Sequence, residues 1–170
     1  MGKGRRPDIS CKNIYEIDPA ALKKQGIYGL VFDIDNTMEP YKAPEPGEKL
    51  TEWLNGLAAD GFRLGILSNA SRGRIERFVG GFPEPLRSDL FCVYGAAKPS
   101  KKGYRALSEM CGLGPEALAM VGDQLFTDIW GGNRAGWLTV LVEPIEPAAE
   151  PPFVRFKRKL EKLLYERKNV

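Results

Sequence analysis

The sequence predicts an α/β protein with a three-layer αβα, Rossmann-like fold, a mainly parallel central sheet, no cap domain and an added C-terminal amphipathic helix. Three observations predict this class. Short apolar runs alternate with helix-like segments along the chain. The apolar runs are continuous rather than alternating, as in parallel strands that are covered on both faces. Polar residues directly follow several of these runs, and ligands of open α/β sheets bind at the carboxyl ends of strands.

Length and composition favour one soluble globular domain. The chain has 170 residues, which is enough to bury a hydrophobic core. No run approaches the roughly 20 apolar residues that cross a bilayer. The basic start at residues 1–7 lacks the apolar stretch of a secretory signal. We therefore expect a cytoplasmic protein. A further expectation is that it binds peripherally to the inner face of the membrane.

The first half of the chain alternates helix and strand signals. Asp18 as an N-cap, Pro19 at the first helical position and Gly26 as a stop delimit a short helix. A later segment places four apolar residues on one face of a helix that Gly61 ends. Residues 1–12 carry no such signal and are expected to be loosely held. The expected elements are a helix over 18–26, a strand over 28–34, a helix over 48–60 and a strand over 62–67.

The second half repeats this alternation. Three glycines interrupt the helical segment before the last strand, so that helix is expected to be broken. The expected elements are a short helix after Ser71, a strand over 91–94, a helix over 100–111, and strands over 117–121 and 138–142. We divide the chain into a domain over 1–143 with its core at 28–143, a Pro-rich linker over 144–152 and a basic amphipathic helix over 153–170.

The chain contains no histidine, which excludes whole classes of chemistry. Ser-His-Asp and Cys-His nucleophile systems and all His-ligated metal sites are ruled out. A general acid or base must be a carboxyl group, lysine, tyrosine or cysteine. The three cysteines, Cys11, Cys92 and Cys111, are odd in number and widely spaced, which argues against a disulfide framework and for a reducing compartment.

Two acids, Asp33 and Asp35, directly follow the apolar run at 29–32. Their side chains leave the same side of the strand, so the carboxylates converge. Such crowding at the end of a buried strand disfavours two negative charges, unless one group takes up a proton or a cation is bound. Both outcomes suit phosphoryl chemistry, with one carboxylate as nucleophile, one as proton carrier and a metal ion beside them.

Polar side chains also follow three further strands. Because the carboxyl ends of parallel strands meet at one edge of the sheet, we expect these side chains to lie near the two acids. Taken alone, each has a plainer interpretation as a helix cap or a surface residue. The residues are Ser68 and Asn69 after the strand over 62–67, Lys98 after that over 91–94, Asp123 after that over 117–121, and Asp128 close behind it.

In their order along the chain, these segments resemble the four motifs of the haloacid dehalogenase (HAD) superfamily. The resemblance covers about 28–145 and implies an αβα core, a phosphatase reaction through an aspartyl-phosphate, and Mg²⁺ as cofactor. The segments that carry it are Asp33-Ile34-Asp35-Asn36-Thr37, Leu67-Ser68-Asn69, Lys98-Pro99, Gly122-Asp123 and Thr127-Asp128.

The resemblance implies a role for each matching residue. Asp33 is implied as the nucleophile, and Asp35 as the acid/base that protonates the leaving oxygen and then takes a proton from water. Ser68, Asn69 and Lys98 are implied to hold the phosphate, and Lys98 also balances the charge of Asp33. The implied metal ligands are Asp33, Asp35 through its backbone carbonyl, and Asp123, and the implied supporting residues are Thr37 and Asp128.

The spacing of the motifs leaves no room for a cap domain. About 30 residues separate Asp35 from Ser68, and about 30 separate Ser68 from Lys98. The expected strands and helices of the core use up both intervals. An open site cannot exclude water by closing on a small metabolite, but it admits a phosphate group on something large.

The C-terminal segment has a distinct pattern. From residue 152 onward, seven basic and two acidic residues give a charge of +5, whereas the whole chain carries +3. Three interpretations stay open. The helix packs on the domain, or residues 153–168 contact an anionic membrane surface, or the helix binds nucleic acid, for which the sequence offers no strong signal. The apolar residues at helical spacing are Phe153, Phe156, Leu160, Leu163 and Leu164.

The capless arrangement resembles HAD subfamily IIIA, in particular its YqeG-type bacterial members, which are related to mitochondrial and plastid phosphatidylglycerophosphate phosphatases. This resemblance implies a phosphorylated lipid as substrate and phosphatidylglycerol as product. One alternative is a phosphatase for a nucleic-acid end, a protein or a soluble metabolite. Another is a receiver-like phospho-acceptor module, against which Asp35 and the separate Asp123 both argue. A third is a non-catalytic scaffold at a lipid surface.

Overall fold

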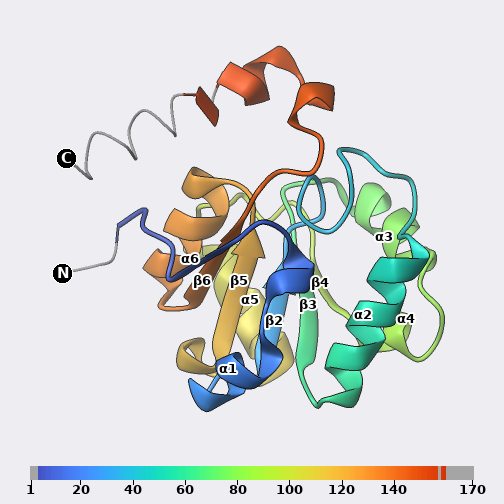
Figure 1. The fold of residues 1–170 in the computed structure, drawn as a ribbon, viewed down its shortest axis with the longest axis vertical. Helices are drawn as coiled ribbons and strands as arrows, with labels where there is room; N and C mark the ends of the chain where they lie inside the picture. The colour runs from blue at the N-terminus through green and yellow to red at the C-terminus, as the bar shows by residue number, and fades with distance from the viewer. Residues whose placement is uncertain (1–3, 157, 160–170) are drawn as a thin grey trace.

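The computed structural model describes residues 4–156 and 158–159, and it confirms the α/β prediction (Figure 1). These residues form a six-stranded, wholly parallel sheet in the order β1-β6-β5-β2-β3-β4. The order reverses between β2 and β5, which lie side by side in the middle of the sheet. The strands are β1 (Ile9–Cys11), β2 (Gly29–Phe32), β3 (Arg63–Leu67), β4 (Phe91–Val93), β5 (Leu118–Gly122) and β6 (Leu138–Val142).

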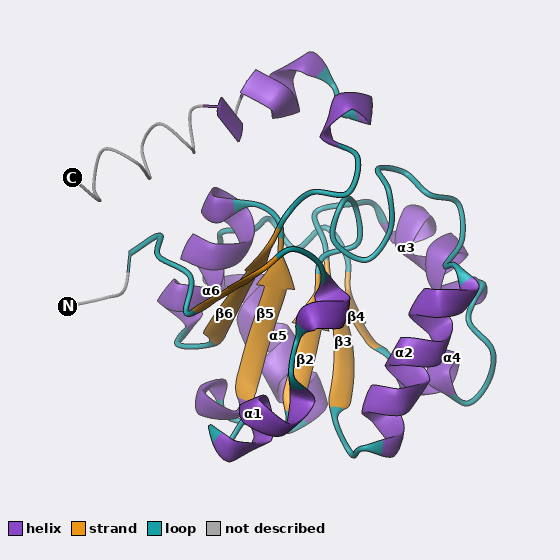
Figure 2. Ribbon diagram, in the orientation of Figure 1, coloured by secondary structure: helices purple, strands orange, loops and turns teal. Residues whose placement is uncertain are grey.

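Helices cover both faces of this sheet and complete the three layers (Figure 2). Side chains of α1 to α4 pack in one apolar cluster, and α5 contributes to the other. The broken helix before β6 consists of a π-helical turn, η3, followed directly by α6. The helices are α1 (Pro19–Lys24), α2 (Glu48–Ala59), α3 (Arg72–Gly80), α4 (Leu86–Asp89), α5 (Lys101–Cys111) and α6 (Trp130–Ala135), with short helical turns η1 (Ile14–Glu16), η2 (Pro115–Ala117), η3 (Leu125–Ile129) and η4 (Pro147–Ala149).

The two apolar clusters lie on opposite sides of the sheet. Leu30 and Phe32 of β2 belong to the cluster that α1 to α4 cover, whereas Val31 between them belongs to the cluster with Tyr104 and Leu107 of α5. Successive side chains of a strand point to opposite faces, and both faces are buried here. This is why the strands read as continuous apolar runs in the sequence.

The prediction of a loosely held segment over 1–12 is wrong for its last residues. Ile9–Cys11 forms the edge strand β1, in which Ile9 lies opposite Val140 of β6. The Asp8 carboxylate accepts hydrogen bonds from the Thr139 backbone N–H at 2.9 Å and from its hydroxyl at 3.1 Å. Pairing to an exposed sheet edge outweighs the weak local signal of three residues. Residues 1–3 of the same prediction lie outside the described part of the chain.

Within residues 33–98, all of which the structure describes, no additional domain is inserted between the strands. The interval from β2 to β3 holds a loop and α2, and the interval from β3 to β4 holds α3 and α4. The carboxyl edge of the sheet is therefore not covered by a cap from this part of the chain.

After β6 the chain rises above the carboxyl ends of the strands (Figure 1). The expected linker over 144–152 contains η4 and the buried Glu150. Residues 152–156 and 158–159 are helical, while 157 and 160–170 of the predicted helix lie outside the described residues. Among the helices that the structure describes, none has the length and apolar character needed to span a membrane.

Candidate active site

Polar side chains gather at the carboxyl edge where the strand order reverses. Asp33 follows β2 and Asp123 follows β5, the two adjacent strands at this reversal. Ligand sites of open α/β sheets lie at such a point. Ser68 follows β3, and Lys98 lies in the loop after β4. Asp33, Ser68 and Lys98 line a cavity of about 170 Å³, together with Asp35, Asn69, Glu150 and Val154.

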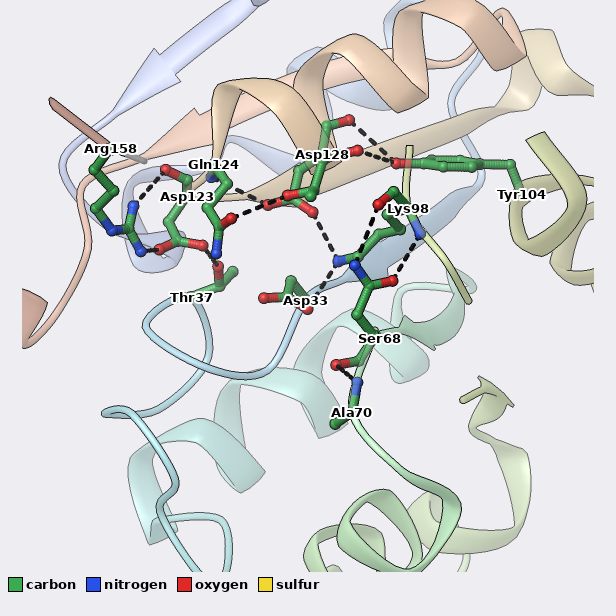
Figure 3. A network of polar contacts seen from close by, with 12 residues as sticks. Asp33, Thr37, Ser68, Ala70, Lys98, Tyr104, Asp123, Gln124, Asp128 and Arg158 are labelled. Atoms are coloured by element: carbon green, nitrogen blue, oxygen red, sulfur yellow. Dashed lines mark hydrogen bonds and ion pairs between the residues drawn. The ribbon is translucent and has the colours of Figure 1, made fainter. Parts of the chain in front are cut away.

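Three aspartates and one lysine form the buried centre of the site, shown in Figure 3. Carboxylate oxygens of Asp33, Asp123 and Asp128 lie within 4.8 Å of one another. Lys98 Nζ donates to Asp33 Oδ1 at 2.8 Å and to Asp128 Oδ1 at 2.7 Å. On the other side, Thr37 Oγ1 donates to Asp123 Oδ1 at 3.1 Å. The three aspartates are hereafter called the aspartate cluster.

The electrostatics of the aspartate cluster reflect an excess of negative charge. Burial first, and then the charges of Asp128 and Asp33, raise the pKa of Asp123 to about 7, although Arg158 opposes this shift. Burial also raises the pKa of Asp128, against the effect of Lys98. Burial would lower the pKa of Lys98, but Asp128 and Asp33 raise it overall, so this ammonium group stays charged.

The donor set fits a divalent cation. When ionised, the three carboxylates and the neighbouring Glu150 face two cations, Lys98 and Arg158, which leaves two negative charges in excess. Carboxylate oxygens are the ligands that hard divalent cations prefer. The resemblance implied Asp35 as a ligand through its backbone carbonyl. The Asp35 carboxylate lies outside the cluster, whereas that of Asp128 lies within it.

Close packing beneath the site positions Asp128. A Cβ atom on Gly122 would overlap the Asp128 carboxyl group, so only glycine fits at this position. The buried Tyr104 hydroxyl donates to the Thr127 carbonyl at 2.7 Å, and Gly131 leaves the space that this hydroxyl occupies. Gly131 of the broken helix therefore serves packing under the site.

The side chain of Asn69 holds the backbone of Lys98 from both sides. Asn69 Oδ1 accepts from the Lys98 N–H at 2.7 Å, and Asn69 Nδ2 donates to the Lys98 carbonyl at 3.2 Å. Ser68 Oγ accepts from the Ala70 N–H at 3.2 Å and lies at the cavity wall. Asn69 thereby fixes the loop that carries Lys98, a function that its place in the sequence did not reveal.

The carboxylate of Asp35 faces Arg74 of α3 instead of the aspartate cluster. Asp35 Oδ1 accepts from Arg74 Nη2 at 3.1 Å and from the Lys42 N–H at 2.7 Å. Both ion-paired side chains are partly buried, with 25% of Asp35 and 19% of Arg74 exposed. Sequence analysis missed Arg74, because a lone arginine in a helix gives no signal of a contact 39 residues away.

The motif residue Asn36 joins the loop after β2 to the C-terminal segment. Asn36 Nδ2 donates to Glu150 Oε1 at 2.7 Å, and its Oδ1 accepts from the Glu146 N–H at 2.9 Å. Its φ of 63° is one that asparagine adopts more readily than most residues. The segment predicted as a linker is therefore fastened to the site.

Arg158 reaches from the C-terminal helix into the same site (Figure 3). Its Nη1 donates to the Asp123 carbonyl at 3.1 Å, its Nε donates to Glu150 Oε2 at 2.6 Å, and its Nη2 contacts Asp123 Oδ2 and Glu150 Oε1. Phe153 and Phe156 point outward and are 76% and 66% exposed. The described part of the helix thus contacts the domain through Arg158, while Phe153 and Phe156 stay exposed.

Comparisons with known proteins agree with this geometry. Residues 95–144 match the HAD-hydrolase-like family. The chain is 36% identical to "Probable phosphatase YqeG" of Bacillus subtilis, across 92% of this chain and 87% of that protein. It is 34% identical to "Phosphatidylglycerophosphate phosphatase 1, chloroplastic/mitochondrial" of Arabidopsis thaliana, across 95% of this chain but 47% of that protein. The solved structure of CbbY from Rhodobacter sphaeroides in complex with phosphate shares the fold, with a TM-score of 0.58 at 13% identity over 74% of this chain and 90% of that one.

The reversed strand order, with acids and a lysine at its carboxyl edge, is the arrangement that the resemblance to HAD hydrolases predicted. The chain belongs to the HAD-like phosphatases, in the family of YqeG, and is therefore a hydrolase that acts on phosphate esters. It spans about half the length of the Arabidopsis relative.

Proposed function

We propose that this phosphatase hydrolyses the phosphomonoester of a phospholipid precursor, with phosphatidylglycerophosphate as the favoured substrate, through an aspartyl-phosphate and with Mg²⁺. The observation that carries the reaction is the position of Asp33, which accepts from the Lys98 ammonium group at 2.8 Å and has a carboxylate oxygen within 4.8 Å of those of Asp123 and Asp128. A carboxylate in this setting attacks a phosphate only if positive charge is close by.

Asp33 acts as the nucleophile in this proposal. Lys98 holds Oδ1, which leaves Oδ2 to form a bond to phosphorus while the bond from phosphorus to the leaving oxygen breaks. Lys98 also supplies one positive charge that is built into the site. The Ser68 hydroxyl and the Asn69 backbone N–H donate to the phosphate oxygens, while the Asn69 side chain keeps Lys98 in place.

Asp35 acts as the acid/base. It gives a proton to the leaving oxygen and then takes one from the water that attacks the aspartyl-phosphate, so the enzyme returns to its starting state. Arg74 and the Lys42 N–H both bind Oδ1, which leaves Oδ2 for proton exchange. Arg74 is thus a positioning residue, since it acts through Asp35.

Asp33, the Asp35 backbone carbonyl and Asp123 are the proposed Mg²⁺ ligands, with Asp128 and Thr37 in support. When bound, the ion supplies the positive charge that draws a phosphate dianion toward the nucleophile. The two negative charges in excess at the site, counted after Lys98 and Arg158, support this assignment. Asp128 keeps Lys98 in place at 2.7 Å, and Thr37 orients Asp123 at 3.1 Å.

Two observations support a lipid substrate. The Arabidopsis relative is named as a phosphatidylglycerophosphate phosphatase, and its similarity covers 95% of this chain. The helix beside the cavity exposes Phe153 and Phe156 next to the exposed basic residues Arg155 and Lys159, a pattern that suits an anionic membrane surface. We extend this proposed peripheral contact to residues 153–168, of which the structure describes 153–156 and 158–159.

The test is phosphate release from a panel of substrates with and without Mg²⁺. Phosphatidylglycerophosphate in vesicles should be turned over faster than glycerol 3-phosphate, a phosphopeptide and a 5′-phosphorylated oligonucleotide. Equal or faster release from a soluble ester would refute the lipid proposal. Unchanged release in the presence of a metal chelator would refute the Mg²⁺ proposal.

A further inference from the structure

A cation from the C-terminal helix already binds the aspartate cluster. The hydrogen-bond donors of Arg158 are directed at two carboxylates and one carbonyl, those of Asp123 and Glu150. Its side chain is 16% exposed, and Glu150 is 5% exposed. The pKa of Glu150 is lowered against the effect of burial, through hydrogen bonds from Arg158 and Asn36. These hydrogen bonds and ion pairs hold the C-terminal helix against the site.

Arg158 occupies Asp123, which is one of the proposed ligands of the metal ion. Asp123 Oδ1 accepts from Thr37, Oδ2 is bound by Arg158, and the Asp123 backbone carbonyl also accepts from Arg158. A divalent ion on Asp123 would repel a guanidinium group on the same carboxylate. Arg158, in contrast, lies on a peripheral helix and can withdraw from Asp123, while Asn36 keeps Glu150 in place through a hydrogen bond of 2.7 Å.

We propose that Arg158 is an internal competitor of the metal ion for Asp123, so that the helical residues 152–156 and 158–159 form a latch that is closed without metal and released when metal binds. This inference rests on the proposed metal role of Asp123. It deepens the proposed function, because the released helix also carries Phe153 and Phe156 on its exposed side. Arg158 adds its positive charge to the helix once it leaves Asp123, so an anionic membrane should bind the released helix more tightly than the closed one. Since coupling between two binding events is reciprocal, such a membrane must also tighten metal binding.

The decisive experiment measures the Kd for Mg²⁺ by calorimetry on the full chain, without substrate. Arg158→Gln removes the charge, and Arg155→Gln is the matched control, since it removes one charge from an exposed position of the same helix. We expect Arg158→Gln to bind Mg²⁺ at least about fivefold more tightly than the unmodified protein, and Arg155→Gln to stay within about twofold of it. Unchanged or weaker Mg²⁺ binding in Arg158→Gln would overturn the proposal.

A second measurement needs no variant. Addition of Mg²⁺ to the unmodified protein should raise amide hydrogen exchange in a peptide covering 152–159, and vesicles of phosphatidylglycerol, but not of phosphatidylcholine, should lower the Kd for Mg²⁺. Slower exchange on Mg²⁺ addition would contradict the latch, and equal effects of the two lipids would contradict its coupling to an anionic membrane. Tighter Mg²⁺ binding in Arg158→Gln without turnover of phosphatidylglycerophosphate would refute the proposed substrate alone, whereas the reverse result would refute the latch alone.

Discussion

Two basic side chains flank the aspartate cluster, and the protein holds them in different ways. Lys98 belongs to the domain: its side chain is 2% exposed, and its ammonium group contacts Asp33 and Asp128. Arg158 belongs to the C-terminal helix: its side chain is 16% exposed, and it contacts Asp123 and Glu150. The core encloses one charge, while the other lies on a segment fastened by a few polar contacts.

This difference separates a permanent charge from an exchangeable one. Removal of an enclosed cation leaves buried carboxylates without compensation, which is strongly destabilising. A cation on a peripheral helix can withdraw and be replaced by water or a metal ion. Substitutions around Lys98 should therefore lower the stability of the protein more than substitutions around Arg158.

The largest effect on turnover is expected at Asp33, to which Lys98 donates a hydrogen bond. Asp33→Asn replaces the proposed nucleophile by an amide and should lower turnover by about 10⁴-fold or more. Phosphate release measures this loss, and circular dichroism should show an intact fold. Asp89→Asn, at an exposed aspartate of α4, is the control and should keep full activity. Comparable activity of Asp33→Asn and Asp89→Asn would show that another group is the nucleophile.

The contributions of Lys98 and Arg158 to the free energy of unfolding can be compared directly. Lys98→Met should lower the free energy of unfolding by about 3–5 kcal/mol, because Asp33 and Asp128 lose their buried counter-ion. Arg158→Met should lower it by less, about 1–3 kcal/mol, because the helix that buries Asp123 and Glu150 can lift and admit water to them. Urea titrations of both variants measure the difference. Equal losses would show that the C-terminal helix is as much a part of the core as the Lys98 loop.

Gly122 tests how tightly the protein packs around Asp128, the buried partner of Lys98. Gly122→Ala places a methyl group against the Asp128 carboxyl group and should cost about 1–3 kcal/mol of stability. Gly56→Ala is the matched control, since its Cβ meets nothing within 4 Å in the exposed middle of α2. The control should gain up to about 1 kcal/mol. Thermal unfolding distinguishes the two, and a neutral Gly122→Ala would mean that Asp128 can shift freely.

The smallest effect is expected from a third cation, which positions the acid/base. Arg74→Gln should lower kcat by about tenfold with little change in KM, because Asp35 loses its orientation rather than the substrate its binding site. Arg74→Lys should recover part of the loss, since it restores the charge but not the planar contact. If KM rises and kcat does not change, Arg74 binds the substrate instead.

Most of the fold could be predicted because its strands are buried on both faces. β2, β3, β5 and β6 each read as an apolar run, and Asp18 and Pro19 marked the start of α1. β1 could not be predicted, because its three residues are only partly buried and gain their structure from β6. Pairing partners at a sheet edge are a tertiary property that no local pattern records.

The same reasoning separates the site residues that could be predicted from those that could not. Asp33, Ser68 and Asp123 each follow a strand directly, so the parallel sheet brings them to one edge. Arg158 and Glu150 reach the site through the path of the chain after β6. Glu150 lies 114 residues from its partner Asn36. The sequence around Glu150 has no local pattern that indicates this contact.

The central claim is that Asp33 forms a covalent phosphoryl intermediate at this edge of the sheet. It is tested most directly by acid-quenching the enzyme during turnover of phosphatidylglycerophosphate with Mg²⁺, followed by peptide mass spectrometry. We predict one phosphoryl group on Asp33, which disappears as the substrate is exhausted and is absent from Asp33→Asn. A phosphoryl group on another residue, or steady turnover with no phosphorylated peptide at any quench time, would contradict the account.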